Sequence, residues 1–212
     1  MPSSDVKPTR TELLATKKKI AISESGYELL KIKREGLIMS FFKVLDEAKD
    51  IRGQLIEQHK EARQNITIAS TVEGDLAVKT ASFALSTKPE INLGSRNIMG
   101  VTVPVIEGTK VGRSLDQRGY GLIGTSPYIN DAARSYEGLV ELIIKAAEVE
   151  TTMKKLLDEI ERTKRRVNAL EFKVIPQLKE AERFIELRLE ELERENTFRL
   201  KRIKAKKEAA MA

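Results

Sequence analysis

Two apolar rows with a seven-residue period, one near each end of the chain, constrain the fold most. The first runs from Leu13 to about residue 58 and the second from Leu139 to about residue 181. A strict period of seven keeps one face of a helix against a partner when the two helices wind in a left-handed supercoil. The rows therefore predict two long helices. The residues expected in the seam of this shaft are Leu13, Ile20, Tyr27, Leu30, Leu37, Phe41, Ile51, Leu139, Met153, Ile160, Val167 and Val174.

The composition agrees with a thin, solvent-wrapped shape. Charged residues make up 33% of the 212 residues, against roughly 25% in compact domains, and aromatic residues only 5%. We predict a mainly α protein, a long antiparallel left-handed two-helix coiled coil formed by the N- and C-terminal helices, with a small middle head that contains a β-hairpin. The expected boundaries are 1–64 for the first helix, 65–130 for the head and 131–212 for the last helix.

The same composition argues against several functional classes. The chain has no Cys and one His, His59, so a disulfide framework, a thiolate metal site and a histidine triad are not expected. No catalytic residue, cofactor site or metal site is predicted. No apolar run approaches the roughly 18 residues of a membrane span, and Met1 to Arg10 lacks a secretory signal. We therefore expect no direct membrane insertion, and a chain that stays in the cytoplasm or docks on a membrane complex from that side.

Local signals mark the ends of the two helices. Thr9 and Glu12 fit a capping box, and the helical pattern continues to about Arg63. The second pattern starts near residue 131 and contains Pro176, which predicts a bend or twist between residues 174 and 178. Antiparallel pairing with the ends of the two rows aligned would place Leu13 near Ala181 and Leu55 near Leu139.

The head is marked by turn-forming residues and one β-branched run. Eight of the twelve glycines fall between residues 65 and 130, together with three of the six prolines. Residues 101–106 alternate as in a strand, and residues 107–110 are expected to form its turn. Pro104 cannot donate to a strand ladder, which puts this strand at an edge or beside a bulge.

Two segments superficially match phosphate-binding motifs. Residues 119–124 read G-x-G-x-x-G, but no buried strand precedes them and no βαβ unit surrounds them, so a loop is the better interpretation. Residues 108–114 resemble a P-loop but lack its lysine and its glycine spacing. No nucleotide site is predicted.

Basic residues gather near both chain ends, and antiparallel pairing would bring them to one tip. A soluble helix end with positive charge is the simpler alternative explanation. Because no aromatic residues are interleaved for stacking on bases, a nucleic-acid partner is not expected. The residues of this basic tip are Arg10, Lys17, Lys18, Lys19, Arg199, Lys201, Arg202 and Lys204.

Three segments resemble a known family, the D subunits of the archaeal and vacuolar-type rotary ATPases. They are residues 8–14, residues 26–34 and, in the head, residues 97–104. The resemblance covers nearly the whole chain and is stronger for the archaeal branch. It implies a non-catalytic central shaft that carries torque between the catalytic ring and the ion-driven membrane rotor.

The resemblance also implies partners. The tip with both termini would enter the ring of catalytic A and regulatory B subunits, and the other end would meet the F subunit and the funnel-shaped C (d-type) subunit on the membrane rotor. The head surface expected to dock the F subunit consists of Met99, Gly100, Val101, Val103, Pro104, Val105 and Ile106. Two alternatives remain open from the residues alone, a prefoldin-like coiled-coil chaperone and a basic nucleic-acid-binding rod.

Overall fold

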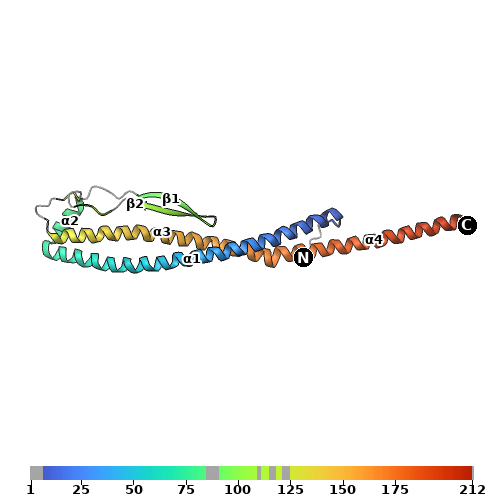
Figure 1. Cartoon of the computed structure of the whole chain (residues 1–212), viewed down its shortest axis with the longest axis horizontal. Coiled ribbons are helices and arrows are strands. Elements are labelled where there is room, and N and C mark those ends of the chain that lie inside the picture. The colour runs from blue at the N-terminus through green and yellow to red at the C-terminus, as the bar shows by residue number, and fades with distance from the viewer. Residues whose placement is uncertain (1–6, 85–90, 109–110, 115–117, 121–124, 212) are drawn as a thin grey trace. The chain divides into compact units, whose positions relative to one another are not determined.

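The computed structural model describes residues 7–84, 91–108, 111–114, 118–120 and 125–211 (Figure 1). It is mainly helical, with a long helix toward each end of the chain and a two-stranded antiparallel hairpin between them, which confirms the predicted fold class. In chain order the elements are α1 (Arg10–Glu73), α2 (Asp75–Phe83), β1 (Ile91–Ile98), β2 (Val101–Gly108), α3 (Pro127–Ala169), the π-helical turn η2 (Leu170–Val174) and α4 (Ile175–Met211).

The chain forms two compact units. The terminal unit consists of Met1–Glu35 and Glu161–Ala212, and the middle unit consists of Gly36–Ile160. Each unit contains a part of α1 and a part of the second long helical stretch, which consists of α3, η2 and α4.

Helix α1 begins as expected and ends later than expected. The Thr9 hydroxyl accepts the backbone N–H of Glu12 at 3.2 Å, while the N–H of Thr9 itself donates to the Lys7 carbonyl at 2.9 Å. The helix does not stop near Arg63 but continues to Glu73, because the first helix breaker is Gly74, whose φ of 85° favours glycine. Helix α2 was not predicted, and α3 begins at Pro127 instead of residue 131.

Ion pairs in the terminal unit show that α1 and α4 run antiparallel. Lys17 contacts Glu186 at 2.8 Å, and further along α1 Glu24 contacts Lys179 at 2.8 Å. The predicted register is wrong here, because Leu13 lines a shallow hollow with Leu189 and does not lie at Ala181. The error is close to one heptad, and a repeated apolar pattern can pair almost as well one repeat further along.

A π-helical turn precedes Pro176. The N–H of Ile175 donates to the carbonyl of Leu170, a spacing of five residues in place of the usual four. This turn lies directly before the stretch where Pro176 predicted a distortion, and the bend itself stays a prediction. Val167 before the turn and Ile185 after it are both buried, so the helix keeps an apolar row inside the unit on both sides.

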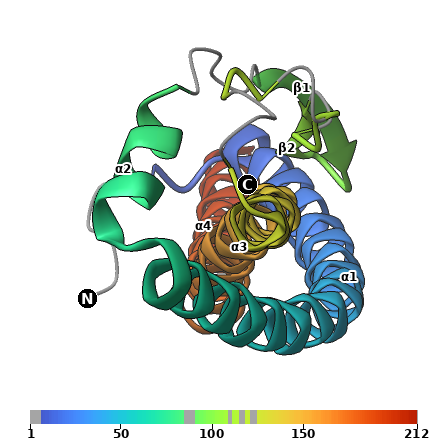
Figure 2. The ribbon, with the colours of Figure 1, turned by 90° about the vertical axis from the view of Figure 1, so that its left-hand side faces the viewer.

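In the middle unit α3 runs beside α1 (Figure 1). Asn65 donates from Nδ2 to the Ser135 hydroxyl at 2.7 Å, whereas the predicted register would have placed residue 129 there, so that register is wrong in this unit too. The hairpin and α2 lie separately around α3 when the unit is viewed end on (Figure 2). Leu37 of α1 and Leu156 of α3 form a buried cluster with Val101 and Val103 of the hairpin.

The hairpin turns before the predicted strand, not after it. β2 pairs with β1, from Ile98 opposite Val101 to Ile91 opposite Gly108. Met99 and Gly100 form the turn with φ values of 50° and 86°, the positive values that a type I′ turn requires. The Asn97 side chain accepts the Gly100 N–H at 2.8 Å. The turn expected at residues 107–110 is therefore wrong; residues 109 and 110 lie outside the described residues.

Candidate partner-binding sites

Burial divides the predicted head surface into two parts. Val101 and Val103 are buried against the helices, with Val103 only 1% exposed. Met99 and Gly100 at the turn are exposed, and Pro104, Val105 and Ile106 are half-buried. The two valines therefore hold the hairpin in place, whereas the turn and the outer side of the hairpin stay at least partly exposed.

The hairpin turn fits over a glycine of α1. A Cβ built on Gly36 would lie 2.5 Å from Cε and 2.8 Å from Sδ of Met99, closer than real contacts allow. Gly36 thus admits the methionine side chain against the helix backbone. This close approach and the buried valines fix the position of the hairpin on the helix pair in the middle unit.

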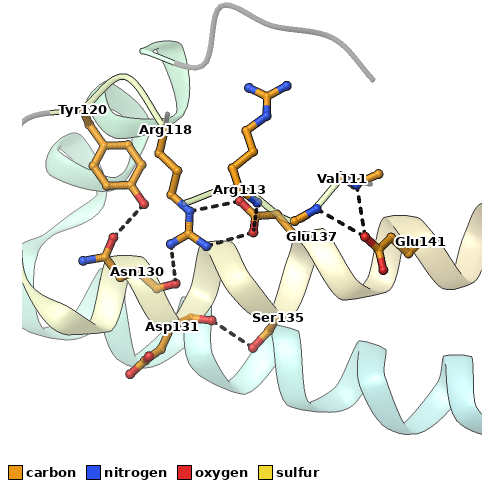
Figure 3. Close-up of polar contacts among 10 residues, drawn as sticks. Val111, Arg113, Arg118, Tyr120, Asn130, Asp131, Ser135, Glu137 and Glu141 are labelled. Atoms are coloured by element: carbon orange, nitrogen blue, oxygen red, sulfur yellow. Dashed lines mark hydrogen bonds and ion pairs between the residues drawn. The ribbon is translucent and has the colours of Figure 1, made fainter. Parts of the chain in front are cut away.

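A polar cluster lies where the chain returns from the hairpin to α3 (Figure 3). Arg118 donates from Nε and Nη2 to both carboxylate oxygens of Glu137, at 3.0 and 2.8 Å, and from Nη1 to the Asn130 carbonyl at 3.2 Å. The side chains of Arg118 and Glu137 are 4% and 15% exposed. Tyr120 donates to the Asn130 side-chain oxygen at 2.8 Å. We call Arg118, Tyr120, Asn130 and Glu137 the α3 clasp.

The charge of Arg118 is secured by its partner. Burial acts to lower the pKa of Arg118, but the hydrogen bonds and charge of Glu137, with a contribution from Tyr120, outweigh it and raise the pKa above its usual range. The guanidinium is therefore charged at any physiological pH. A paired charge in this setting tolerates burial, whereas an unpaired one does not.

Carboxylates of α3 also hold the backbone that follows the hairpin. One oxygen of Glu141 accepts the N–H groups of Val111 and Gly112, at 3.1 and 3.3 Å, and Glu137 accepts the N–H of Arg113 at 3.3 Å (Figure 3). These contacts were missed by sequence reasoning, because nothing in a charged helix distinguishes Glu137 and Glu141 from other carboxylates. The one signal available was their spacing of four residues, which places both on one helix face.

The predicted basic tip lies in the terminal unit, and part of it is used within the chain. Arg10 pairs with Glu193 at 2.5 Å, and Lys17 contacts Glu186 and Glu182 at 2.8 and 3.7 Å. The hydrogen bond and charge of Glu186, and then those of Glu182, raise the pKa of Lys17. Lys19 lies 4.0 Å from Glu12. Arg10 and Lys17 thus join α1 to α4, and Lys19 lies near a carboxylate of its own helix, so these three residues offer less net charge than the sequence suggested.

Helix α4 continues well past the start of α1 (Figure 1). Arg10, the first residue of α1, lies at Glu193, and every described side chain of α4 from Glu190 to Ala209 is exposed. This stretch carries Arg199, Lys201, Arg202 and Lys204 from the predicted tip, together with the exposed apolar residues Phe198, Leu200 and Ile203. Both charge and apolar area are therefore exposed on this stretch.

The predicted seam residues are all buried or half-buried. Four of them, Ile20, Leu37, Leu139 and Val167, are at most 8% exposed. The half-buried members are Leu13, Tyr27, Leu30, Phe41, Ile51, Met153, Ile160 and Val174.

The structure also bears on the metal, nucleotide-binding and membrane-spanning patterns considered in the sequence. Among the residues that the structure describes, no group of three or more His, Cys, Asp or Glu side chains is placed to hold a metal ion. Residues 121–124 of the G-x-G-x-x-G stretch, and residues 109 and 110 of the P-loop-like stretch, lie outside the described residues. Over the described ranges, no helix is long and apolar enough to cross a bilayer.

Comparison with known proteins gives matches over almost the entire chain. A family model that describes the D subunit of ATP synthase matches residues 12–205. The A-type ATP synthase D subunit of Methanoregula boonei is 60% identical over 206 residues, which are 97% of this chain and 99% of the relative. The protein of the same name from Methanococcoides burtonii is 61% identical, over 96% of this chain and 99% of the relative. That of Halobacterium salinarum is 53% identical, over 95% and 90%.

Proposed function

The chain belongs to the family of ATP synthase D subunits, and on that premise we propose that it is the non-catalytic central-stalk component of an A-type ATP synthase. In this role it transmits torque between the catalytic A/B ring and the ion-driven membrane rotor. The observation that carries the proposal is the match over nearly the full length, which includes both long helices and the hairpin. A prefoldin-like chaperone and a nucleic-acid-binding rod have no comparable support.

The helix pairing suits a load-bearing role. The 64 residues of α1 pair antiparallel with the second helical stretch in both units, through ion pairs in the terminal unit and through a buried apolar cluster in the middle unit. A ring with several equivalent sites can be driven through different affinities only by an element that contacts each site differently. We propose that this chain is that element and that the chemistry stays in the A subunits.

The proposed partners follow from the same premise. They are the A and B subunits around the terminal unit, and the F subunit and the funnel-shaped C (d-type) subunit at the middle unit. The assembly would hold the chain peripherally on the cytoplasmic side of the cell membrane. A three-part division into an N-terminal helix, a middle head that serves as a docking module and a C-terminal helix is also part of the proposal, with the helices reaching Glu73 and starting at Pro127 rather than at the expected boundaries.

The predicted basic tip provides the first test. Neutralising Lys18, Arg199, Lys201 and Arg202 to Gln should lower the torque and the coupling of ATP hydrolysis to rotation, because non-directional attraction to the ring is lost. A matched control neutralises four exposed basic residues of the same unit, Arg162, Lys164, Arg165 and Arg166. Single-molecule rotation with both complexes measures the difference. Equal torque in the two variants would remove the tip from this role.

The hairpin provides the second test. Deletion of residues 97–110 should abolish co-purification of the F subunit, and retained binding would exclude the hairpin as its docking site. A milder variant avoids disturbing the buried valines: Leu93→Gln on the exposed outer side of β1 should weaken F binding. Leu76→Gln, an equally exposed leucine on α2, is the matched control and should have no effect.

A further inference from the structure

The two edges of the hairpin are protected very differently. On β2, Pro104 interrupts the edge, and Lys155 of α3 donates from Nζ to the Thr102 carbonyl at 3.1 Å. On β1, residues 91–97 are exposed, and Leu93 is 75% exposed. Within the described part of the chain, no backbone bond to β1 is seen other than those of β2. Proteins usually guard a free edge with proline, charge or a covering element, and here only β2 has such protection.

The register shows which backbone groups of β1 point outward. In a two-residue hairpin the pair that closes the turn, Ile98 with Val101, is hydrogen-bonded, and bonded and non-bonded pairs then alternate. Asn97–Thr102 and Ser95–Pro104 are therefore non-bonded pairs. Two observations agree with this assignment. Pro104 has no N–H to give to β1, and the Thr102 carbonyl points away from β1 to meet Lys155.

The outward groups form a regular, uncharged row. The N–H and C=O groups of Ile91, Leu93, Ser95 and Asn97 face away from β2, spaced as in any strand that awaits a neighbour. None of these residues is charged or a proline. The one charged residue of β1, Arg96, is in a hydrogen-bonded pair with Val103, so its backbone groups face β2. An incoming strand would meet matched donors and acceptors without desolvating a charge.

We propose that the free edge of β1 binds an extended segment of a partner protein, which adds to the hairpin as a third strand. Main-chain bonds would supply the affinity, and an apolar side chain opposite Leu93 would supply selectivity. The partner is a different protein that offers an uncharged, partly apolar extended segment, because this chain belongs to a family of ATP synthase subunits and the outward row of β1 carries no charge and exposes Leu93. The inference rests on the proposed function in that the partner is a neighbour in the ATP synthase assembly.

Single-residue hydrogen exchange tests the edge directly. The isotope-labelled chain is compared alone, in the assembled complex, and in a complex that lacks the F subunit. The outward amides of Leu93, Ser95 and Asn97 should exchange at least tenfold more slowly in the assembly. The inward amides of Gly94, Arg96 and Ile98 serve as the internal control, because they are already bonded within the hairpin.

A proline on the edge tests the same bonds by mutation. Ser95→Pro places proline opposite Pro104, at a non-bonded pair, so the hairpin should persist while one outward donor is lost and the ring blocks a new strand. The slowing of exchange that assembly causes at Leu93 and Asn97 should fall at least tenfold in Ser95→Pro, and Ser95→Ala should leave it unchanged. Should the hairpin of the proline variant lose the slow exchange of Arg96 and Ile98, the exchange measurement on the natural sequence decides.

The outcomes separate this inference from the proposed function. Slow outward amides both with and without the F subunit support the third strand and assign it to another neighbour. Unprotected outward amides in a complex whose F binding needs the hairpin overturn the third strand and leave the proposed function intact. Protection already present in the isolated chain overturns the inference as well: a doubled mass would identify a second copy as the occupant, and a monomer a segment of the same chain.

Discussion

Replacement of Glu137 by glutamine probes the α3 clasp, because the change removes a charge and keeps the shape. Arg118, 4% exposed, would keep its positive charge, since its pKa lies above the usual range and no other carboxylate is bonded to it among the described residues. Removing one partner of a buried ion pair costs about 3–5 kcal/mol. Glu137 retains 15% exposure, so water can enter on its side and the lower value, about 3 kcal/mol, is expected.

Native-state hydrogen exchange is the suitable assay, because the chain has two units and a single unfolding transition cannot be assumed. The amides of Val111, Gly112 and Arg113 report opening of the segment that α3 holds. A cost of about 3 kcal/mol corresponds to roughly 100-fold faster exchange, up to the rate of the fully open segment. Glu141→Gln is the matched control, and we expect a cost nearer about 1 kcal/mol because no buried charge is orphaned.

The double variant Arg118→Met with Glu137→Met removes both charges. We expect it to recover much of the stability lost in Glu137→Gln, because an apolar pair of similar size often replaces a buried ion pair at little cost. Equal and small effects of Glu137→Gln and Glu141→Gln would refute the reasoning, since they would mean that water solvates the guanidinium despite its burial.

Further predictions concern packing and pH. Leu37→Ala, at a fully buried position under the hairpin, should lower the free energy of unfolding of the middle unit by about 2–5 kcal/mol. Leu93→Ala, on the exposed outer side, should change it by less than about 0.5 kcal/mol, and native-state hydrogen exchange of middle-unit amides compares the two variants. Because the pKa of Lys17 is raised in the folded chain, its ion pair with Glu186 stabilises fully from neutral pH up to the ordinary lysine value of 10.5, and this contribution is lost as pH rises through the folded pKa. Nitrogen NMR of Lys17 should show that higher pKa, and Glu186→Gln should lower it.

The helices could be predicted from the sequence because burial of an apolar row is a local, periodic signal. Leu37 belongs to the first apolar row and Val167 to the second, and both are buried as the helical spacing of their rows requires. The register could not be predicted, since a heptad row looks the same one repeat along, and the ion pairs that decide it, such as Lys17 with Glu186, join residues far apart in sequence. The end of α1 was misplaced because the seam fades before the breaker, Gly74, is reached.

The candidate sites were less predictable. The strand at Val101 was recognisable from its β-branched alternation, but its turn was not, because Met99 is an unusual residue for a positive φ and depends on Gly100 and the Asn97 side chain. The α3 clasp depends on Arg118 meeting Glu137 across a loop, which no periodicity encodes. Exposure also reassigned roles, since Val101 and Val103 were expected on a docking surface and instead anchor the hairpin.

The π-helical turn at Leu170–Val174 has a consequence for how this helix tolerates change in length. Such a turn is equivalent to an α-helix with one residue inserted. Loss of a single residue from Leu170–Val174 would therefore restore regular α-helical phase across this stretch, apart from the hydrogen bond that Pro176 cannot donate, with Val167 and Ile185 still facing the same neighbours. Elsewhere along α3 and α4 the same deletion would rotate every later side chain by about 100°, since an α-helix has 3.6 residues per turn. Within the packed part of this long helix, the segment can therefore lose one residue without rotating the side chains that follow it.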